Sequence, residues 1–146
     1  MGMTAQPGLL NAPRSLLLSK CPLAFSERRF VFLTWCCVAI LAFLSLLPAQ
    51  EMVRTGFPGQ LEHFVAYAGS AAIAMSGYGL NRKAPWVIGY FWLCAGILEY
   101  LQHFSPGRHP AVEDFAASAL GALCGGVAVL LLWRCRSAIP GWRNAA

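Results

Sequence analysis

Polar and ionisable side chains gather in one stretch of an otherwise apolar chain, between Glu99 and Gly121. Glu99, Gln102, Arg108 and Asp114 lie in this stretch, together with two of the three histidines of the chain. An ionisable side chain costs about 2.5–3.5 kcal/mol at the centre of a membrane-inserted helix, so it usually marks a functional site and has a partner. With polar residues from the neighbouring segments, the candidate site consists of His63, Tyr67, Glu99, Gln102, Arg108, Asp114 and Ser118.

Three kinds of role fit these residue types. In the first, the cluster is structural: Arg108 bridges Glu99 and Asp114, and the other polar side chains complete a hydrogen-bonded network between helices. In the second, the cluster binds a ligand, because the fork of donors on Arg108 suits a phosphate or a carboxylate. In the third, the cluster is catalytic, and His63, Glu99 or Asp114 acts as a general acid or base.

Covalent catalysis and metal binding have less support. A nucleophile is hard to identify, because neither Ser105 nor Ser118 has an obvious partner in the sequence. A metal site would draw on His63, His103, His109 and a carboxylate, but no helix carries two histidines at the His-x-x-x-His spacing that suits a single metal ion. We therefore expect no metal and no other cofactor.

The elements that must position these residues are apolar helices. Of the 146 residues, 58% are hydrophobic and only 12% are charged, and the mean hydropathy is +0.55. A soluble domain needs more charge to cover its surface, whereas a helix that crosses a bilayer needs about 20 mainly apolar residues. Four stretches meet that requirement. The sequence predicts an all-α membrane protein, a bundle of four transmembrane helices at about residues 30–47, 63–80, 86–104 and 113–133.

Two of these helices carry a face of polar and small residues. Steps of four, seven and eleven residues, which return to the same side of a helix, connect His63, Tyr67, Ser70 and Ala74. The same steps connect Asp114, Ser118, Gly121 and Gly125. Small residues let membrane helices approach closely, and Gly121 with Gly125 forms a Gly-x-x-x-Gly pair. We expect these two faces to be packing faces.

The distribution of charge predicts the orientation in the membrane. Nine of the eleven basic residues lie before the first helix, between the second and third, or after the fourth. The positive-inside rule then places both termini in the cytoplasm, with a basic leader at residues 1–29, partly disordered, and a basic tail at 134–146. Five of the six acidic residues lie on or near the opposite side, so the candidate site faces outward. The basic side touches anionic lipid rather than nucleic acid.

Three motifs resemble the VanZ-like family of small bacterial membrane proteins. They are His63-Phe64-x-Ala66-Tyr67, Glu99-x-x-Gln102-x-Phe104-x-Pro106-x-Arg108 and Asp114-x-x-Ala117-Ser118-x-x-Gly121, which together span about residues 60–130. The chain departs from the family pattern at two places. Gly59-Gln60 stand where members often have Asp-Lys, and Ser118 stands where they have asparagine.

The resemblance implies a multi-pass protein of the bacterial cytoplasmic membrane with a VanZ-like domain over residues 30–133, and a role in envelope properties or antibiotic resistance. It leaves the chemistry open. We expect the site to bind an anionic envelope lipid or a cell-wall precursor, without catalysis. One alternative is a membrane-embedded acid–base enzyme acting on an envelope lipid. Another is an accessory subunit of a membrane complex, suggested by the small size of the chain and an exposed face at Gly121 and Gly125. A homo-oligomer is a further possible partner arrangement.

Overall fold

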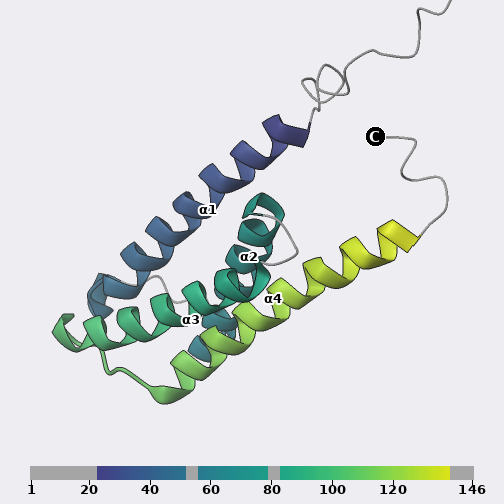
Figure 1. Cartoon of the computed structure of the whole chain (residues 1–146). Coiled ribbons are helices and arrows are strands. Elements are labelled where there is room, and N and C mark those ends of the chain that lie inside the picture. The colour runs from purple at the N-terminus through teal and green to yellow at the C-terminus, as the bar shows by residue number, and fades with distance from the viewer. Residues whose placement is uncertain (1–22, 52–55, 79–82, 139–146) are drawn as a thin grey trace, which may run out of the picture.

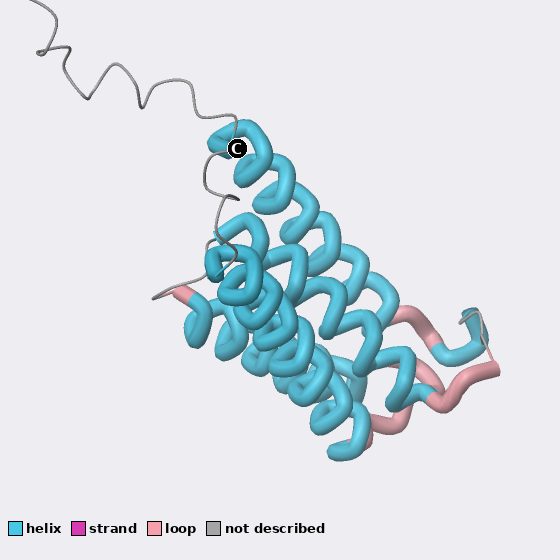
Figure 2. Tube along the Cα trace, turned by 90° about the vertical axis from the view of Figure 1, so that its right-hand side faces the viewer, coloured by secondary structure: helices cyan, strands magenta, loops and turns pink. Residues whose placement is uncertain are grey.

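The computed structural model describes residues 23–51, 56–78 and 83–138, and this part of the chain contains helices and no strand. The described residues contain four long helices. They alternate in sense along the bundle and cross one another at an angle (Figures 1 and 2). Their bounds are α1 Leu23–Leu46, α2 Gly59–Tyr78, α3 Ala84–Leu101 and α4 Val112–Ala138. Two single turns of 3₁₀ helix, η1 Ala49–Glu51 and η2 Gln102–Phe104, follow α1 and α3. The prediction of an all-α fold is confirmed.

Among the described residues, three of the four long helices are long and apolar enough to cross a membrane, namely Glu27–Leu46, Ala84–Phe104 and Val112–Cys135. These are α1, α3 with η2, and α4, so three of the four predicted segments form helices that are able to span a membrane. Helix α2 does not qualify, because polar residues open it and small ones such as Gly69, Ser70 and Ser76 lower its hydropathy.

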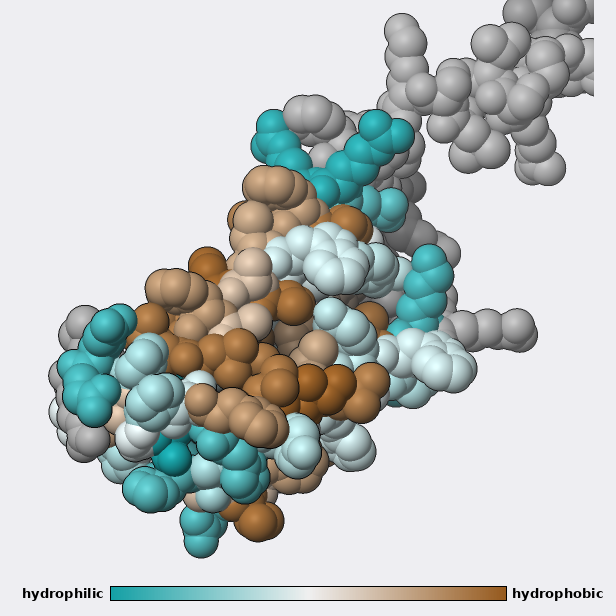
Figure 3. All heavy atoms as spheres, turned by 90° about the vertical axis from the view of Figure 1, so that its left-hand side faces the viewer, coloured by the Kyte–Doolittle hydropathy of each residue, from teal (hydrophilic) through white to brown (hydrophobic). Residues whose placement is uncertain are grey.

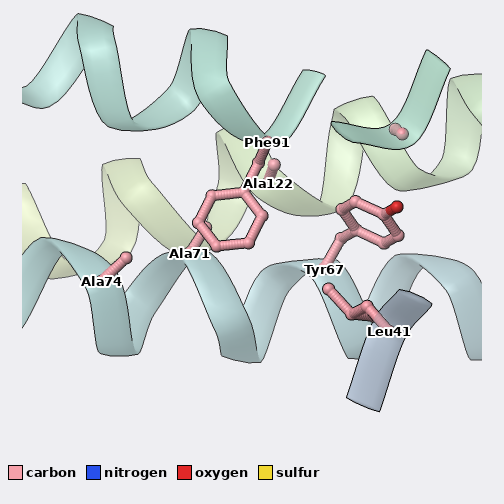
Figure 4. Packing of buried hydrophobic residues seen from close by; sticks show 7 residues of the cluster. Leu41, Tyr67, Ala71, Ala74, Phe91 and Ala122 are labelled. Atoms are coloured by element: carbon pink, nitrogen blue, oxygen red, sulfur yellow. The ribbon is translucent and has the colours of Figure 1, made fainter. Parts of the chain in front are cut away.

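Helix α2 forms the centre of the bundle. It contacts the other three long helices, α4 most extensively and then α1. Six of its residues are buried, five of them apolar or small and one a serine. Figure 4 shows Tyr67, Ala71 and Ala74 of α2 meeting Phe91 of α3, Ala122 of α4 and Leu41 of α1. A helix that packs against three others needs small residues on its contact faces, which is consistent with its low hydropathy.

The predicted packing faces are confirmed. Tyr67, Ser70 and Ala74 are buried on α2, and Gly121 and Gly125 are buried on α4. A Cβ atom on Gly121 would collide with the Phe64 carbonyl of α2, and one on Gly125 with that of Ala68. The glycine pair is therefore covered within the chain. The expectation that it forms an exposed face for a partner subunit is wrong, because α2 already occupies it.

The helix boundaries differ from the predicted ones in two main respects. Helix α1 begins at Leu23 rather than near residue 30, and α4 continues to Ala138 rather than ending near 133, so the expected leader and tail each contribute residues to a helix. Residues 1–22 of the leader and 139–146 of the tail lie outside the described residues. Helix α2 begins four residues early, directly after Pro58, which accepts hydrogen bonds from the N–H groups of Leu61 and Glu62.

The two ends of the bundle differ in charge. The start of α1, the start of α3 and the end of α4 share one end, which carries Arg28, Arg29, Lys83 and Arg134 along with Glu27 (Figure 1). The opposite end holds Arg108 and the five remaining acidic residues, Glu51, Glu62, Glu99, Glu113 and Asp114. Figure 3 shows hydrophobic residues over the middle of the molecule and hydrophilic ones towards its two ends. We call these the basic end and the acidic end.

Candidate functional site

The loop between α3 and α4 is fastened to the end of α1. Arg108 donates from Nε to the Leu47 carbonyl (3.2 Å) and from Nη2 to the Leu44 carbonyl (2.8 Å). Ser105 donates its hydroxyl to the Leu46 carbonyl at 3.1 Å. The last carbonyl groups of a helix have no partner within the helix, and a cation near them interacts favourably with the helix dipole. Arg108 and Ser105 therefore cap α1.

This cap replaces the bridge that the structural interpretation proposed for Arg108. Within the described residues, no ion pair joins Arg108 to Glu99 or to Asp114. A guanidinium group has five N–H donors, and the two hydrogen bonds to α1 use two of them. The backbone thus fixes the position of Arg108 and leaves donors for a ligand.

His63 lies against α4 and contacts two of the predicted site residues. Its Nδ1 atom is 3.3 Å from Oγ of Ser118, and its Nε2 atom is 3.9 Å from Oδ2 of Asp114. The first distance fits a hydrogen bond, and the second fits an ion pair when the imidazole is protonated. Asp114 and Ser118 are one helical turn apart, so one imidazole spans both. The sequence-based interpretation gave Ser118 no partner, and the structure provides His63.

A hydroxyl, an imidazole and a carboxylate in this order are the parts of a serine nucleophile with its base and its orienting acid. Access decides against that role. Ser118 is only 2% exposed, whereas an attacking oxygen must come within about 3–3.5 Å of the substrate atom. His63 is more accessible, with 19% of its side chain exposed. The arrangement therefore suits His63 as the group that meets a ligand, held from behind by α4.

Glu99 lies apart from His63 and Arg108. Its Oε1 atom accepts a hydrogen bond of 2.6 Å from the backbone N–H of Ala111, which directly precedes α4. A carboxylate at this position also interacts favourably with the positive end of the α4 dipole. Glu99 lines a different hollow, beside His103 and Phe115. Its geometry is that of a residue that fixes the start of α4.

Two buried polar atoms have no hydrogen-bond partner among the described residues. They are Nε2 of Gln102, a residue that is 2% exposed, and Oδ1 of Asp114. Buried polar groups nearly always have partners, because leaving one unpaired costs about 1–3 kcal/mol. One atom is a donor and the other an acceptor, so both remain able to bind water or a polar ligand group.

A cleft of about 340 Å³ lies at the acidic end. His63, Tyr67 and Arg108 line it, and of the seven predicted residues these three alone do so. The opposite wall is apolar, with Leu41 and Leu44 of α1 and Leu47 directly after it. The predicted set thus divides into three cleft residues, two residues behind His63 (Asp114 and Ser118), one capping residue (Glu99) and one buried amide (Gln102).

The sequence-based interpretation missed two acidic residues of the cleft, Glu51 and Glu62. Glu62 directly precedes His63 in the first turn of α2, so its position beside the predicted site was readable from the sequence. Glu51 closes η1 after Pro48, and only the fold of the following loop brings it to the cleft. Within the described residues, no group of three histidine, cysteine, aspartate or glutamate side chains is placed to hold a metal ion.

Comparison of this chain with protein-family models, with curated proteins and with solved structures found no match.

Proposed function

We propose that this chain is a VanZ-like membrane protein that binds an anionic envelope lipid or cell-wall precursor in the cleft at its acidic end. The observation that carries the proposal is the position of Arg108. Two hydrogen bonds to backbone carbonyls at the end of α1, those of Leu44 and Leu47, fix its guanidinium at the cleft, and no carboxylate pairs with it among the described residues. An immobilised arginine with free donors is suited to bidentate recognition of a phosphate or carboxylate.

The walls of the cleft fit an amphiphile. Leu41, Leu44 and Leu47 offer an apolar surface on one side, and on the other His63 offers an imidazole beside the buried Tyr67. Glu51 and Glu62 also line the cleft, so a ligand that carried only negative charge would meet repulsion away from Arg108. The best fit is a head group with its acidic group at Arg108 and its hydroxyl or ammonium donors towards the two glutamates.

The proposed topology has four spans, with both termini in the cytoplasm of a bacterial cell. Helix α2 lies inside the bundle and runs between the same two ends as the three apolar helices (Figure 2). The gathering of Arg28, Arg29, Lys83 and Arg134 at one end supports a cytoplasmic position for that end. The cleft then opens at the outer surface of the membrane, where envelope precursors are presented.

Native mass spectrometry of the purified chain tests the proposal. Leu44 lines the cleft and binds Arg108 through its carbonyl, so Leu44→Trp adds bulk at the cleft and keeps the acceptor of the cap. We expect this variant to lose co-purified anionic lipid at least tenfold. Phe43→Trp is the matched control, since Phe43 is exposed and does not line the cleft. Equal lipid content in both variants contradicts the proposal.

A second candidate function, acid–base catalysis, rests on the contacts of His63 with Ser118 and Asp114. An imidazole that lines the cleft and is oriented by a carboxylate is arranged as a general base. With Ser118 inaccessible, such a reaction would use water or a substrate hydroxyl as the nucleophile. His63→Gln separates the two functions: binding alone predicts that turnover is never detected, and catalysis predicts that His63→Gln retains ligand but loses turnover.

A further inference from the structure

An apolar crevice of about 290 Å³ lies between α1 and α3, near the basic end and away from the cleft. Trp35 and Val38 of α1 form one wall, and Trp86 and Val87 of α3 form the other. Phe91, which is fully buried, also lines it. The two helices contact each other little, and an edge-on ring pair of Trp35 and Tyr90, with centroids 6.4 Å apart, is one of the points where they meet.

The crevice makes few polar demands on an occupant. The hydroxyl of Thr34, one of its lining residues, donates to the Phe30 carbonyl at 2.8 Å and is satisfied within α1. The crevice opens among the segments Glu27–Leu46 and Ala84–Phe104, two of the helices that are long and apolar enough to cross a membrane. In that position the surrounding solvent is lipid hydrocarbon, and an acyl chain matches the lining.

Positive charge stands where the crevice meets the basic end. Lys83 lines the crevice and also lines a second, more polar hollow beside it. Tyr78 is shared by the two hollows as well, so they adjoin. Arg28 lines the second hollow together with Glu27, which leaves a net charge of +1 from these three side chains. Basic residues at this level of a membrane attract anionic head groups.

We propose that the two hollows together bind one membrane lipid, with an acyl chain between α1 and α3 and an anionic head group at Lys83 and Arg28. A lipid is the occupant that matches both hollows: its acyl chain matches the apolar crevice, and its phosphate matches the basic hollow. Trp35 and Trp86 flank the chain near the head-group level, where tryptophan is favoured. This site is independent of the cleft proposed above, which lies at the opposite end.

Native mass spectrometry with two added lipids tests the head-group half. The probes are phosphatidylglycerol and phosphatidylcholine with identical acyl chains, added in equal amounts to the purified full-length chain. We expect phosphatidylglycerol to be retained preferentially, and Lys83→Gln to lower its retention about fivefold, the effect of one basic residue at a membrane surface. Arg134→Gln is the control, because Arg134 is also at the basic end but lines neither hollow. Equal losses in the two variants would overturn the head-group assignment.

The acyl half is tested by filling the crevice from either wall. Val87→Phe and Val38→Phe each place an aromatic ring where the acyl chain would lie. If one variant fails to fold, the other still gives the measurement. We expect a loss of bound phosphatidylglycerol at least as large as that of Lys83→Gln in the variants that keep a wild-type melting temperature. Unchanged retention in a folded variant would overturn the proposal. So would displacement of the lipid by soluble glycerol phosphate, since the head group alone would then suffice.

Two further outcomes decide between this site and other occupants. A second copy of the chain is the alternative occupant, and a dimer that Val87→Phe dissociates would overturn the lipid assignment. Lipid bound at the cleft is distinguished from lipid bound at the crevice by repeating the Lys83→Gln measurement in the Leu44→Trp variant. We expect the same fivefold loss there. Disappearance of the effect would show that the lipid was bound at the cleft, and would overturn the proposal while leaving the cleft proposal intact.

Discussion

The backbone carbonyl of Ala68 on α2 occupies the position that a side chain at Gly125 on α4 would need. The same relationship holds one turn earlier between Phe64 and Gly121. These two contacts bring the first turns of α2 close to α4. They thereby place the ring of His63 against Ser118 and Asp114. The glycine pair is thus the part of the fold that positions the imidazole at the cleft.

Substitution of Gly125 tests this relationship. Gly125→Ala forces α2 and α4 apart, because the obstacle is a backbone carbonyl that cannot rotate away. We expect the free energy of unfolding to fall by about 2–4 kcal/mol, which is at or above the upper end of the usual cost of overpacking an interior. The melting temperature in detergent should fall with it. Gly89→Ala on α3 is the matched control, since a Cβ atom there meets nothing within 4 Å. Similar melting temperatures for the two variants would refute the close contact.

The double variant of Arg108 and Glu99 tests the capping role. Arg108→Gln removes charge-assisted hydrogen bonds to the end of α1, and such bonds contribute about 1.5–3 kcal/mol. Glu99→Gln weakens a separate hydrogen bond to Ala111. Because the two side chains share no partner, we expect their effects on the free energy of unfolding to add within about 0.5 kcal/mol. Rescue of Arg108→Gln by Glu99→Gln would instead show that the two charges form a pair.

The variants of Ser118 test whether it acts as a nucleophile. Ser118→Ala removes one hydrogen bond to His63 and leaves the cleft lining unchanged. We expect about 1 kcal/mol lower stability and wild-type retention of lipid. Ser76→Ala is the control, since the Ser76 hydroxyl likewise takes part in one hydrogen bond, which it donates to the Ala72 carbonyl within its own helix. Formation of a covalent adduct with a serine-reactive probe in the wild type, abolished by Ser118→Ala, would contradict the burial argument.

Much of the fold could be predicted from the pattern of residues, because helix faces follow a fixed periodicity. The faces through Tyr67 and through Gly121 are both buried as expected. The start of α1 could not be predicted by the same reasoning, since it equated a helix with its apolar part. Glu27, Arg28 and Arg29 are compatible with a helix, and α1 passes through them without interruption.

The arrangement of the site was less predictable. Arg108 binds backbone carbonyls of α1, and every residue has such an acceptor, so nothing in the sequence marks which ones are used. Partners of opposite charge were the natural expectation for Arg108, and the fold places them elsewhere. Ser118 and His63 are 55 residues apart, and their contact depends on the register of α2 against α4. Each residue was on the correct face, but the register could not be inferred.

The orientation in the membrane remains the prediction on which the outward-facing cleft depends. Nine of the eleven basic residues lie within residues 1–29, 81–85 and 134–146, the parts of the chain predicted to be cytoplasmic. Translocating them is costly, so reporter fusions after Ala146 and within residues 81–85 should report the cytoplasm. Fusions at Gly56 and Gly107 should report the opposite side, and both glycines have positive φ angles, 84° and 74°, in turns at the acidic end. A cytoplasmic signal at Gly107 would place the cleft inside the cell and exclude its contact with outer-surface precursors. Opposite signals at Gly56 and within residues 81–85 would also establish α2 as the fourth span, since α2 is the helix that connects these two positions.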